Sequence, residues 1–213
     1  MEEDPKGLLV DYGGVLTPSV GRSFRDFEEA SGLPKGTVFT AVRAAYEHAE
    51  GDDPISRVER GELEIDDFNE LLAEEFAAQG HEVDPDGLAR RMFAGMRPDG
   101  LMWEVVRAAH DEGVRTALVS NSWGVDGYPR DRLEEVFDAV LVSGEVGMRK
   151  PDPAFFELAT DTIGVPPDRC AFVDDLDRNV EAARELGMLA IHHTDPRETA
   201  AALSDFLGLS VEL

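Results

Sequence analysis

The segment that decides the fold is residues 8–17, which read LLVDYGGVLT. An apolar run, Leu8–Val10, ends in the carboxylate of Asp11, and two glycines follow after one further residue. Apolar residues bounded by glycine are typical of a buried strand that runs into a tight turn. Such a strand holds Asp11 at its carboxyl end, where open α/β sheets place their reacting groups. Burying a carboxylate there costs free energy unless a cation or a hydrogen-bond donor compensates its charge. Asp11 is therefore a candidate nucleophile or metal ligand.

Three later segments place further polar side chains at strand ends or in a loop. They are residues 114–121 (VRTALVSN), 144–156 (GEVGMRKPDPAFF) and 170–179 (CAFVDDLDRN). The first is an apolar strand that ends in Ser120 and Asn121, and the second carries Lys150 ahead of two prolines. The third is a strand that ends in the paired carboxylates Asp174 and Asp175. Taken singly, each group also fits a turn former, a solvated lysine or a helix cap, so only their joint order points to a functional site.

That ordered set of Asp, Ser, Lys and Asp-Asp resembles the four motifs of the haloacid dehalogenase-like hydrolases, over about residues 7–192. The resemblance implies a Rossmann-like core with a helical cap inserted after the first motif. It also implies that the strands of the first and fourth motifs are neighbours, which brings Asp11 to the Asp174–Asp175 pair. The first motif and residues 120–123 (SNSW) resemble the phosphatase domain that precedes soluble epoxide hydrolases, and some sugar-phosphate phosphatases.

Residues 22–97 show helical periodicity and no convincing strand. Their apolar residues recur at helix-like spacing, which indicates stripes that face a common core. The residues of these stripes are Ile55, Val58, Leu63, Phe68, Leu71, Leu72 and Phe76. Asp66 is the expected N-cap of the helix that carries the last four of them, and Gly80 is its expected stop.

From Pro98 onward, strands and helices alternate. The expected strands are 114–119, 139–142, 171–173 and 189–192, and the expected helices are 99–112, 130–136, 153–163, 177–186 and 197–207. Alternation of this kind predicts a mostly parallel sheet with helices on both faces. We therefore expect an α/β fold, a doubly wound Rossmann-like sheet with a helical cap after the first strand. The core is expected to comprise residues 1–20 and 98–213, and the cap residues 21–97.

If the three carboxylates converge, their charges need relief. Two carboxylates ~4 Å apart repel by ~4 kcal/mol at an effective dielectric constant of 20. Hard oxygen ligands, with no cysteine cluster or histidine pair nearby, favour Mg²⁺ over Zn²⁺. The resemblance implies that Asp11, the main-chain carbonyl of Gly13 and Asp175 hold the ion, while Asp174 acts through a water or supports the ligands.

The resemblance also implies a role for each remaining site residue. Asp11 would attack phosphorus and form an aspartyl phosphate that water later hydrolyses. Lys150 would offset the charge on Asp11 and the phosphoryl oxygens, and Ser120 and the main-chain amide of Asn121 would donate hydrogen bonds to those oxygens. Trp123 is a candidate for the substrate cleft, with core packing an equally favoured alternative. The expected activity is Mg²⁺-dependent hydrolysis of a small phosphorylated metabolite.

The sequence departs from the family pattern at one position. Most phosphatases of the family carry a second aspartate two residues after the nucleophile, and here that residue is Gly13. A general acid contributes about 10²–10⁴-fold, so we expect a preference for leaving groups that depart readily as anions. Tyr12 does not replace the acid, because adjacent strand residues point to opposite faces. Two alternatives stay open, a lapsed phosphate-binding or interaction module and, less favoured, a haloacid dehalogenase.

Composition restricts the partners. The 213 residues include 20 basic and 45 acidic ones, for a formal net charge of −25, so we expect neither nucleic acid nor membrane as a partner. One cysteine, Cys170, permits no internal disulfide. The first residues lack the features of a signal peptide, and no run approaches the ~18 apolar residues of a membrane span. We expect a cytoplasmic protein with a small phosphorylated substrate, and the sequence predicts no oligomeric state.

Overall fold

The computed structural model describes residues 5–46, 53–97, 100–124 and 126–209. Over these residues the chain forms a five-stranded sheet in the order β3-β2-β1-β4-β5, and every neighbouring pair is parallel. The strands are β1 (Gly7–Val10), β2 (Arg115–Ser120), β3 (Ala139–Val142), β4 (Cys170–Asp174) and β5 (Leu189–His192). The α/β, doubly wound architecture expected from the sequence is confirmed.

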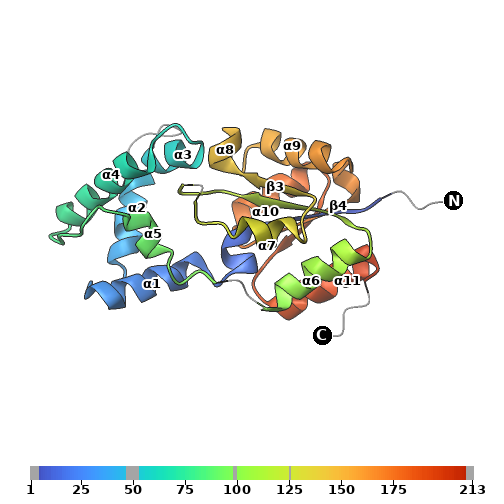
Figure 1. Ribbon diagram of the computed structural model, residues 1–213, viewed down its shortest axis with the longest axis horizontal. Helices are drawn as coiled ribbons and strands as arrows, with labels where there is room; N and C mark the ends of the chain where they lie inside the picture. The colour runs from blue at the N-terminus through green and yellow to red at the C-terminus, as the bar shows by residue number, and fades with distance from the viewer. Residues whose placement is uncertain (1–4, 47–52, 98–99, 125, 210–213) are drawn as a thin grey trace.

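The central strand, β1, is buried along its whole length. Side chains alternate across a strand, so Leu8 and Val10 join the apolar cluster on one face and Leu9 joins the cluster on the other. Helices from later in the chain cover both faces (Figure 1). They are α6 (Gly100–Asp111) and α11 (Pro196–Leu207) on the first face, and α9 (Pro153–Ile163) and α10 (Asp177–Glu185) on the second. Burial on both faces explains why the strands read as apolar runs.

Shorter elements occupy the connections between strands. They are η1 (Tyr12–Leu16) after β1, α7 (Arg130–Glu134) before β3, α8 (Ser143–Val146) after β3 and η2 (Pro167–Arg169) before β4. The four later strands agree with the expected ranges to within one residue at each end. The helix expected over residues 130–136 is two residues shorter, and α8 was not expected, because four residues that include a glycine carry no helical period. The expected starts at Pro98 and Asp99 lie outside the described residues.

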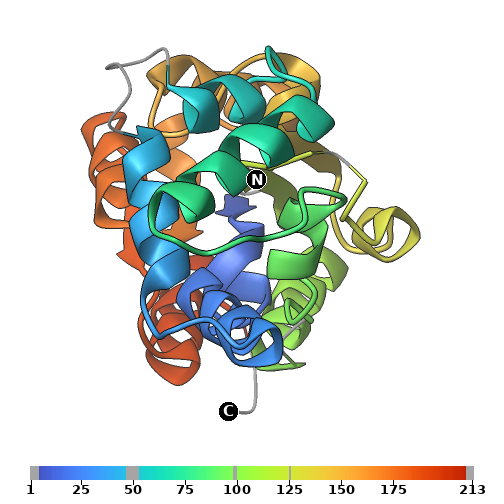
Figure 2. The ribbon, with the colours of Figure 1, turned by 90° about the vertical axis from the view of Figure 1, so that its left-hand side faces the viewer.

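A helical insert lies between β1 and β2 in the chain. Its helices are α1 (Val20–Ser31), α2 (Thr37–Tyr46), α3 (Pro54–Glu59), α4 (Ile65–Ala78) and α5 (Leu88–Met92). Figure 1 shows the insert to the left of the sheet, and Figure 2 shows it in front, over the end of the sheet. The insert has its own apolar cluster, separate from the two clusters that flank the sheet.

Two expectations for the insert are wrong in detail. Leu71 is 37% exposed, because the buried stripe of α4 repeats every four residues at Phe68, Leu72 and Phe76 and leaves Leu71 at its margin. Helix α4 begins at Ile65 after Glu64, so Asp66 lies in the first turn and is not the N-cap. An acid in the first turn still interacts favourably with the helix dipole, which explains why the residue type fits the position.

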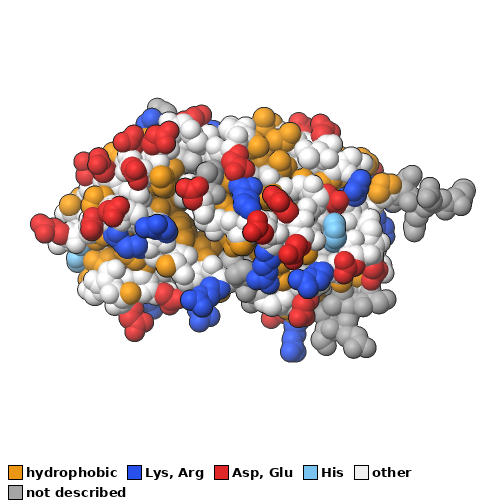
Figure 3. Space-filling view, in the orientation of Figure 1, with side chains coloured by type: hydrophobic (Ala, Val, Ile, Leu, Met, Phe, Trp, Pro, Cys, Tyr) orange, Lys and Arg blue, Asp and Glu red, His pale blue; other side chains and the backbone are white. Residues whose placement is uncertain are grey.

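The surface agrees with the acidic composition. Figure 3 shows acidic side chains over both the insert and the sheet-bearing part, and a hollow between the two parts with hydrophobic side chains on its wall. Among the helices of the described residues, none combines the length and the apolar character needed to cross a bilayer.

Candidate active site

The site begins where β1 ends. Residue pairing aligns Val10 with Leu118 of β2 and with Val173 of β4, so the carboxyl ends of the three central strands meet at one edge. The main-chain N–H of Asp11 continues the ladder by donating to the carbonyl of Val173 over 3.0 Å. This register places the Asp11 side chain beside the end of β4, as the resemblance implied.

Lys150 lies between two of the carboxylates. Its Nζ is 2.8 Å from Oδ1 of Asp11 and 2.6 Å from Oδ2 of Asp174, and its side chain is 1% exposed. The charged head of a buried lysine requires such partners, because an isolated ammonium would not stay charged there. The lysine of the loop is therefore not a solvated one, and it joins the first and fourth motifs.

Asp174 is held by more partners than the lysine alone. Its Oδ1 accepts a hydrogen bond from the main-chain N–H of Leu176 over 2.9 Å, and the Asn179 amide donates to both carboxylate oxygens over 3.0 Å. A fully buried carboxylate that accepts four hydrogen bonds from three donor groups is fixed in place. This geometry suits the supporting role that the sequence analysis gave Asp174. Asn179, in the first turn of α10, was not singled out from the sequence.

Asp175 completes the acidic cluster. One carboxylate oxygen from each of Asp11, Asp174 and Asp175 lies within 4.8 Å of the others. The backbone of Gly14 leaves room for this arrangement: a Cβ on Gly14 would lie 2.1 Å from Oδ2 of Asp175, and its φ of +78° is one that other residues rarely adopt. The second glycine of the LLVDYGGVLT segment is therefore required sterically, because any side chain there would collide with the Asp175 carboxylate.

Burial and like charge shift the acids of the cluster. Burial, with Asp174 and Asp175 adding to it, raises the pKa of Asp11 to about 7 although Lys150 opposes the shift. Burial and the charge of Asp174 raise the pKa of Asp175 to about 6. Burial lowers the pKa of Lys150, but Asp11 and Asp174 outweigh it and hold the ammonium charged. The three carboxylates thus exceed the one ammonium among them, which is the environment that a cation relieves.

The residue types of the cluster fit Mg²⁺. All its donors are oxygens, and no cysteine or histidine belongs to the group identified among the described residues. Oxygen-only sets of this kind favour Mg²⁺ or Ca²⁺ over Zn²⁺. The Gly13 carbonyl, the fourth predicted metal-binding group, belongs to the same turn after β1. Its participation stays a prediction.

Ser120 and Asn121 follow at the end of β2, beside Asp11. The Ser120 hydroxyl is 2.8 Å from the hydroxyl of Tyr128. The Asn121 side chain accepts from the main-chain N–H of Lys150 over 2.8 Å and donates to its carbonyl over 3.0 Å. The side chain of Asn121 therefore fixes the Lys150 backbone, a role that was not predicted, while the predicted role of its main-chain N–H in phosphate binding stays open.

Trp123 joins the sheet-bearing part to the insert. Its ring packs on Phe68 and Phe93, with centroids 5.0 and 5.2 Å away, and its Nε1 donates to Glu59 over 3.3 Å. Of the two alternatives for Trp123, the structure places the ring in packing, and a contact with substrate stays a prediction. Glu59 also accepts from Nε of Arg149 over 2.6 Å. A single sequence contains no pattern from which the ion pair between residues 59 and 149 could be predicted.

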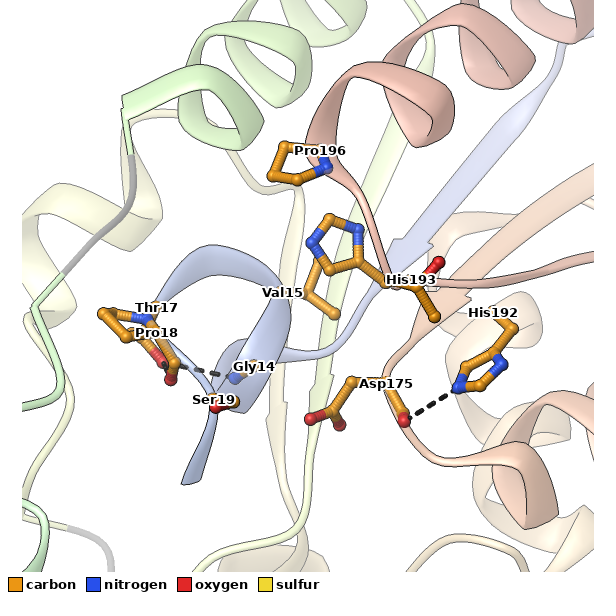
Figure 4. A pocket seen from close by; sticks show the side chains of 10 residues that line it. Gly14, Val15, Thr17, Pro18, Ser19, Asp175, His192, His193 and Pro196 are labelled. Carbon is orange, nitrogen blue, oxygen red and sulfur yellow. Dashed lines mark hydrogen bonds between the residues drawn. The ribbon is translucent and has the colours of Figure 1, made fainter. Parts of the chain in front are cut away.

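A pocket of about 340 Å³ opens next to the acidic cluster (Figure 4). The turn after β1 and the segment after β5 line it, and Gly14 and Asp175 belong both to its wall and to the site. Nε2 of His192 donates to the main-chain carbonyl of Asp175 over 3.1 Å, and its Nδ1 lies 3.0 Å from Oδ1 of Asp177. The pocket gives solvent and small ions a path to Asp175.

Comparisons with known proteins agree with the fold and the motifs. Residues 5–187 match the family model described as haloacid dehalogenase-like hydrolase. Bifunctional epoxide hydrolase 2 of Mus musculus is 29% identical over 202 residues, which cover 86% of this chain but 36% of that protein. A sesquiterpene phosphatase of Aspergillus oryzae is 31% identical over 153 residues, covering 70% of this chain and 77% of that protein. The chain therefore spans well under half of the mouse protein.

Among solved structures, a haloacid dehalogenase family enzyme of Bacteroides thetaiotaomicron, in complex with magnesium and inorganic phosphate, has a TM-score of 0.62. It is 22% identical, and the match covers 86% of this chain and 91% of that one. At this identity the likeness shows the fold alone.

Proposed function

The chain belongs to the haloacid dehalogenase-like hydrolases, and we propose that it is a Mg²⁺-dependent phosphatase that hydrolyses a small phosphorylated metabolite through an aspartyl phosphate on Asp11. The observation that carries the proposal is the cluster of three carboxylates at the carboxyl ends of β1 and β4, two of them buried and paired with the buried Lys150. The excess of negative charge suits a bound cation, and the cation and the ammonium together suit a phosphate. The likeness to a fungal sesquiterpene phosphatase supports the same reaction class.

Asp11, Asp175 and the main-chain carbonyl of Gly13 would hold the ion, and Asp174 would keep Lys150 and the ligands in place. When bound, Mg²⁺ supplies positive charge that offsets the charge of the phosphate and orients it. The bare Cα of Gly14 supports this assignment, because it lets the Asp175 carboxylate reach the turn after β1.

The chain's own groups then account for the two chemical steps. A carboxylate oxygen of Asp11 forms a bond to phosphorus while the bond from phosphorus to the leaving oxygen breaks. Water next attacks phosphorus, and inorganic phosphate and the free Asp11 carboxylate are released. Lys150 offsets charge on the phosphoryl oxygens, and the hydroxyl of Ser120 and the main-chain N–H of Asn121 donate to them.

The leaving group receives no proton from residue 13. A Cβ on Gly13 would lie 3.2 Å from Cε of Met96 and 3.6 Å from Cγ2 of Val20, so apolar groups border the place where a side-chain acid would begin. Aryl, acyl or anomeric sugar phosphates, whose leaving groups depart readily as anions, fit such a site better than simple alkyl phosphates.

Two other functions are less favoured. A protein that binds a phosphorylated metabolite without turnover is the second candidate, because Gly13 removes the side-chain acid. Tight metabolite binding without release of phosphate from a broad panel would support it. A dehalogenase would gain nothing from the carboxylate excess, and chloride release from a 2-haloacid without added Mg²⁺ would support that function.

The experiment that tests the proposal is hydrolysis of p-nitrophenyl phosphate with Mg²⁺ and with EDTA. We expect turnover in Mg²⁺, none in EDTA and none for Asp11→Asn. Glu62→Gln, the same carboxylate-to-amide change at an exposed position paired with Arg60, is the control and should keep wild-type activity. Inactivity of the folded, metal-loaded wild-type protein on this activated substrate would contradict the phosphatase proposal.

A further inference from the structure

The Ser120 hydroxyl has a partner that the proposed mechanism leaves unused. Tyr128, in the segment that leads into α7, places its hydroxyl 2.8 Å from Ser120 Oγ. Nothing in the sequence pattern singled out this tyrosine. It enters the site from a loop, whereas Ser120 ends a strand. The two hydroxyls lie at hydrogen-bond distance, and Ser120 is a candidate hydrogen-bond donor to the phosphoryl oxygens. The direction of the hydrogen bond between them therefore decides where the serine proton points.

The ring of Tyr128 is held firmly beside the nucleophile. It packs against the ring of Tyr12 with centroids 5.0 Å apart, and Tyr12 directly follows Asp11 in the chain. The guanidinium of Arg130 lies over the Tyr128 ring, 5.6 Å from its centroid. Burial and the negative charge of Asp11 raise the pKa of Tyr128 far above its ordinary value, so the hydroxyl keeps its proton.

The hydrogen bonds of Ser120 favour one direction of donation between the two hydroxyls. Within the described residues, its hydroxyl makes one hydrogen bond besides that with Tyr128, in which it donates to the main-chain carbonyl of Asn121 over 3.4 Å. A serine hydroxyl has one proton, and that proton is directed at the carbonyl. In the 2.8 Å contact the geometry allows either hydroxyl to donate, and the bond from Ser120 to the carbonyl favours Tyr128 as the donor and Ser120 as the acceptor. The reverse direction would leave the buried tyrosine proton without this acceptor, which is costly.

The 3.4 Å bond from Ser120 to the carbonyl is long, so a better acceptor can replace it. We propose that Tyr128 is a positioning residue of the phosphoryl site: its hydroxyl donates to Ser120 and thereby directs the serine proton to a phosphoryl oxygen at Asp11. This inference rests on the proposed phosphatase function. It predicts that Tyr128 acts through Ser120 and not through an independent contact.

The test is a double-mutant cycle on p-nitrophenyl phosphate hydrolysis. Tyr128→Phe keeps the ring and its packing on Tyr12 but removes the donor, and we expect kcat/KM to fall about 5- to 20-fold. Ser120→Ala should lower kcat/KM further. In the double variant Tyr128→Phe should have no added effect, because the acceptor is already gone. Tyr12→Phe removes a hydroxyl from the other ring of the same stack and should stay within about twofold of wild type.

The outcomes separate this inference from the phosphatase proposal. Wild-type activity in Tyr128→Phe, or effects of the two substitutions that multiply in the double variant, would overturn the inference. If the wild-type protein shows no turnover, the phosphatase proposal fails. Mg²⁺-dependent binding of inorganic phosphate to the wild type, the two single variants of the cycle and the double variant then decides the role of Tyr128. Weaker binding in Tyr128→Phe, but no difference in the Ser120→Ala background, supports it. Equal binding in wild type and Tyr128→Phe, or no phosphate binding at all, overturns it.

Discussion

Two neighbouring residues, Arg149 and Lys150, enter two different buried clusters. Lys150 enters the acidic cluster of Asp11, Asp174 and Asp175, the proposed catalytic cluster, where its ammonium pairs with Asp11 and Asp174. Arg149 enters an interface cluster, formed by Glu59 of the insert with Arg149, Asn121 and Trp123. One peptide bond separates a site with surplus negative charge from a site in which one carboxylate meets one guanidinium.

The difference teaches how to distinguish a structural ion pair from a functional one. The interface cluster balances its charges with groups of the chain, so it needs no further ion. The catalytic cluster does not: burial raises the pKa of Glu59 as well as those of Asp11 and Asp175, but in the catalytic cluster repulsion between carboxylates raises the pKa further. Such an excess of negative charge at a largely buried site favours the binding of a cation.

Removing the ammonium from the catalytic cluster should have the largest effect. Lys150→Met leaves the carboxylates without a cationic partner and removes charge stabilisation of the phosphoryl group, so we expect kcat/KM to fall about 10³-fold. The same change at the interface, Arg149→Met, should lower kcat/KM less than about 10-fold. Steady-state kinetics on p-nitrophenyl phosphate measure both, and equal losses would remove the distinction between the clusters.

Because Gly13 supplies no side-chain acid, kcat/KM should depend steeply on how readily the leaving group departs as an anion. Because no side chain at this position donates a proton, we expect aryl phosphates to react about 10²-fold faster in kcat/KM than alkyl phosphates of similar size. A series of substituted phenyl and alkyl phosphates measures the slope. A flat series would mean that another group of the catalytic cluster supplies the proton.

Breaking the interface cluster should affect stability rather than chemistry. Glu59→Ala leaves the Arg149 guanidinium buried without its carboxylate, so we expect the free energy of unfolding to fall by about 3 kcal/mol. Urea unfolding followed by circular dichroism measures the loss. Thr40→Ala, on an exposed part of the insert, is the control and should change stability by less than about 0.5 kcal/mol. A Glu59 variant as stable as wild type would show that this pair contributes nothing.

Metal binding should depend on pH through the raised pKa values of the catalytic cluster. Asp11, with a pKa of about 7, and Asp175, with a pKa of about 6, must lose their protons before they bind the ion. Protons therefore compete with the metal as the pH falls, and the apparent affinity for Mg²⁺ should decrease about 10-fold from pH 7.5 to pH 6. Calorimetric titrations at both values measure it, and an affinity that rises on acidification would contradict the assignment of the ligands.

The sequence predicted those parts of the fold and site that are local in the chain. Ser120 and Asp174 each end an apolar strand and Asp11 directly follows one, and parallel strands bring their carboxyl ends to one edge, so these positions followed from linear patterns. Lys150 was recognised by its order among the motifs. The short helix α8 was missed, because four residues are too few to show a period.

The contacts between distant segments could not be predicted from one sequence. Glu59 meets Arg149 across 90 residues, and a lone glutamate on a helix is most often solvated. The side chains of Asn121 and Tyr128 also act through partners that no local pattern indicates. Asn179 offered a weak signal, a polar residue in the first turn of the helix that follows the acidic pair, and burial against Asp174 explains it.

The most direct test of the central claim is calorimetric titration of Mg²⁺ into wild-type protein, Asp175→Asn and Glu59→Gln at pH 7.5. The charge contrast predicts one site in the wild type, at least about 10-fold weaker binding in Asp175→Asn, and wild-type affinity in Glu59→Gln. Binding that Asp175→Asn leaves unchanged, or that the wild type lacks, would contradict the claim that the catalytic cluster is a cation site.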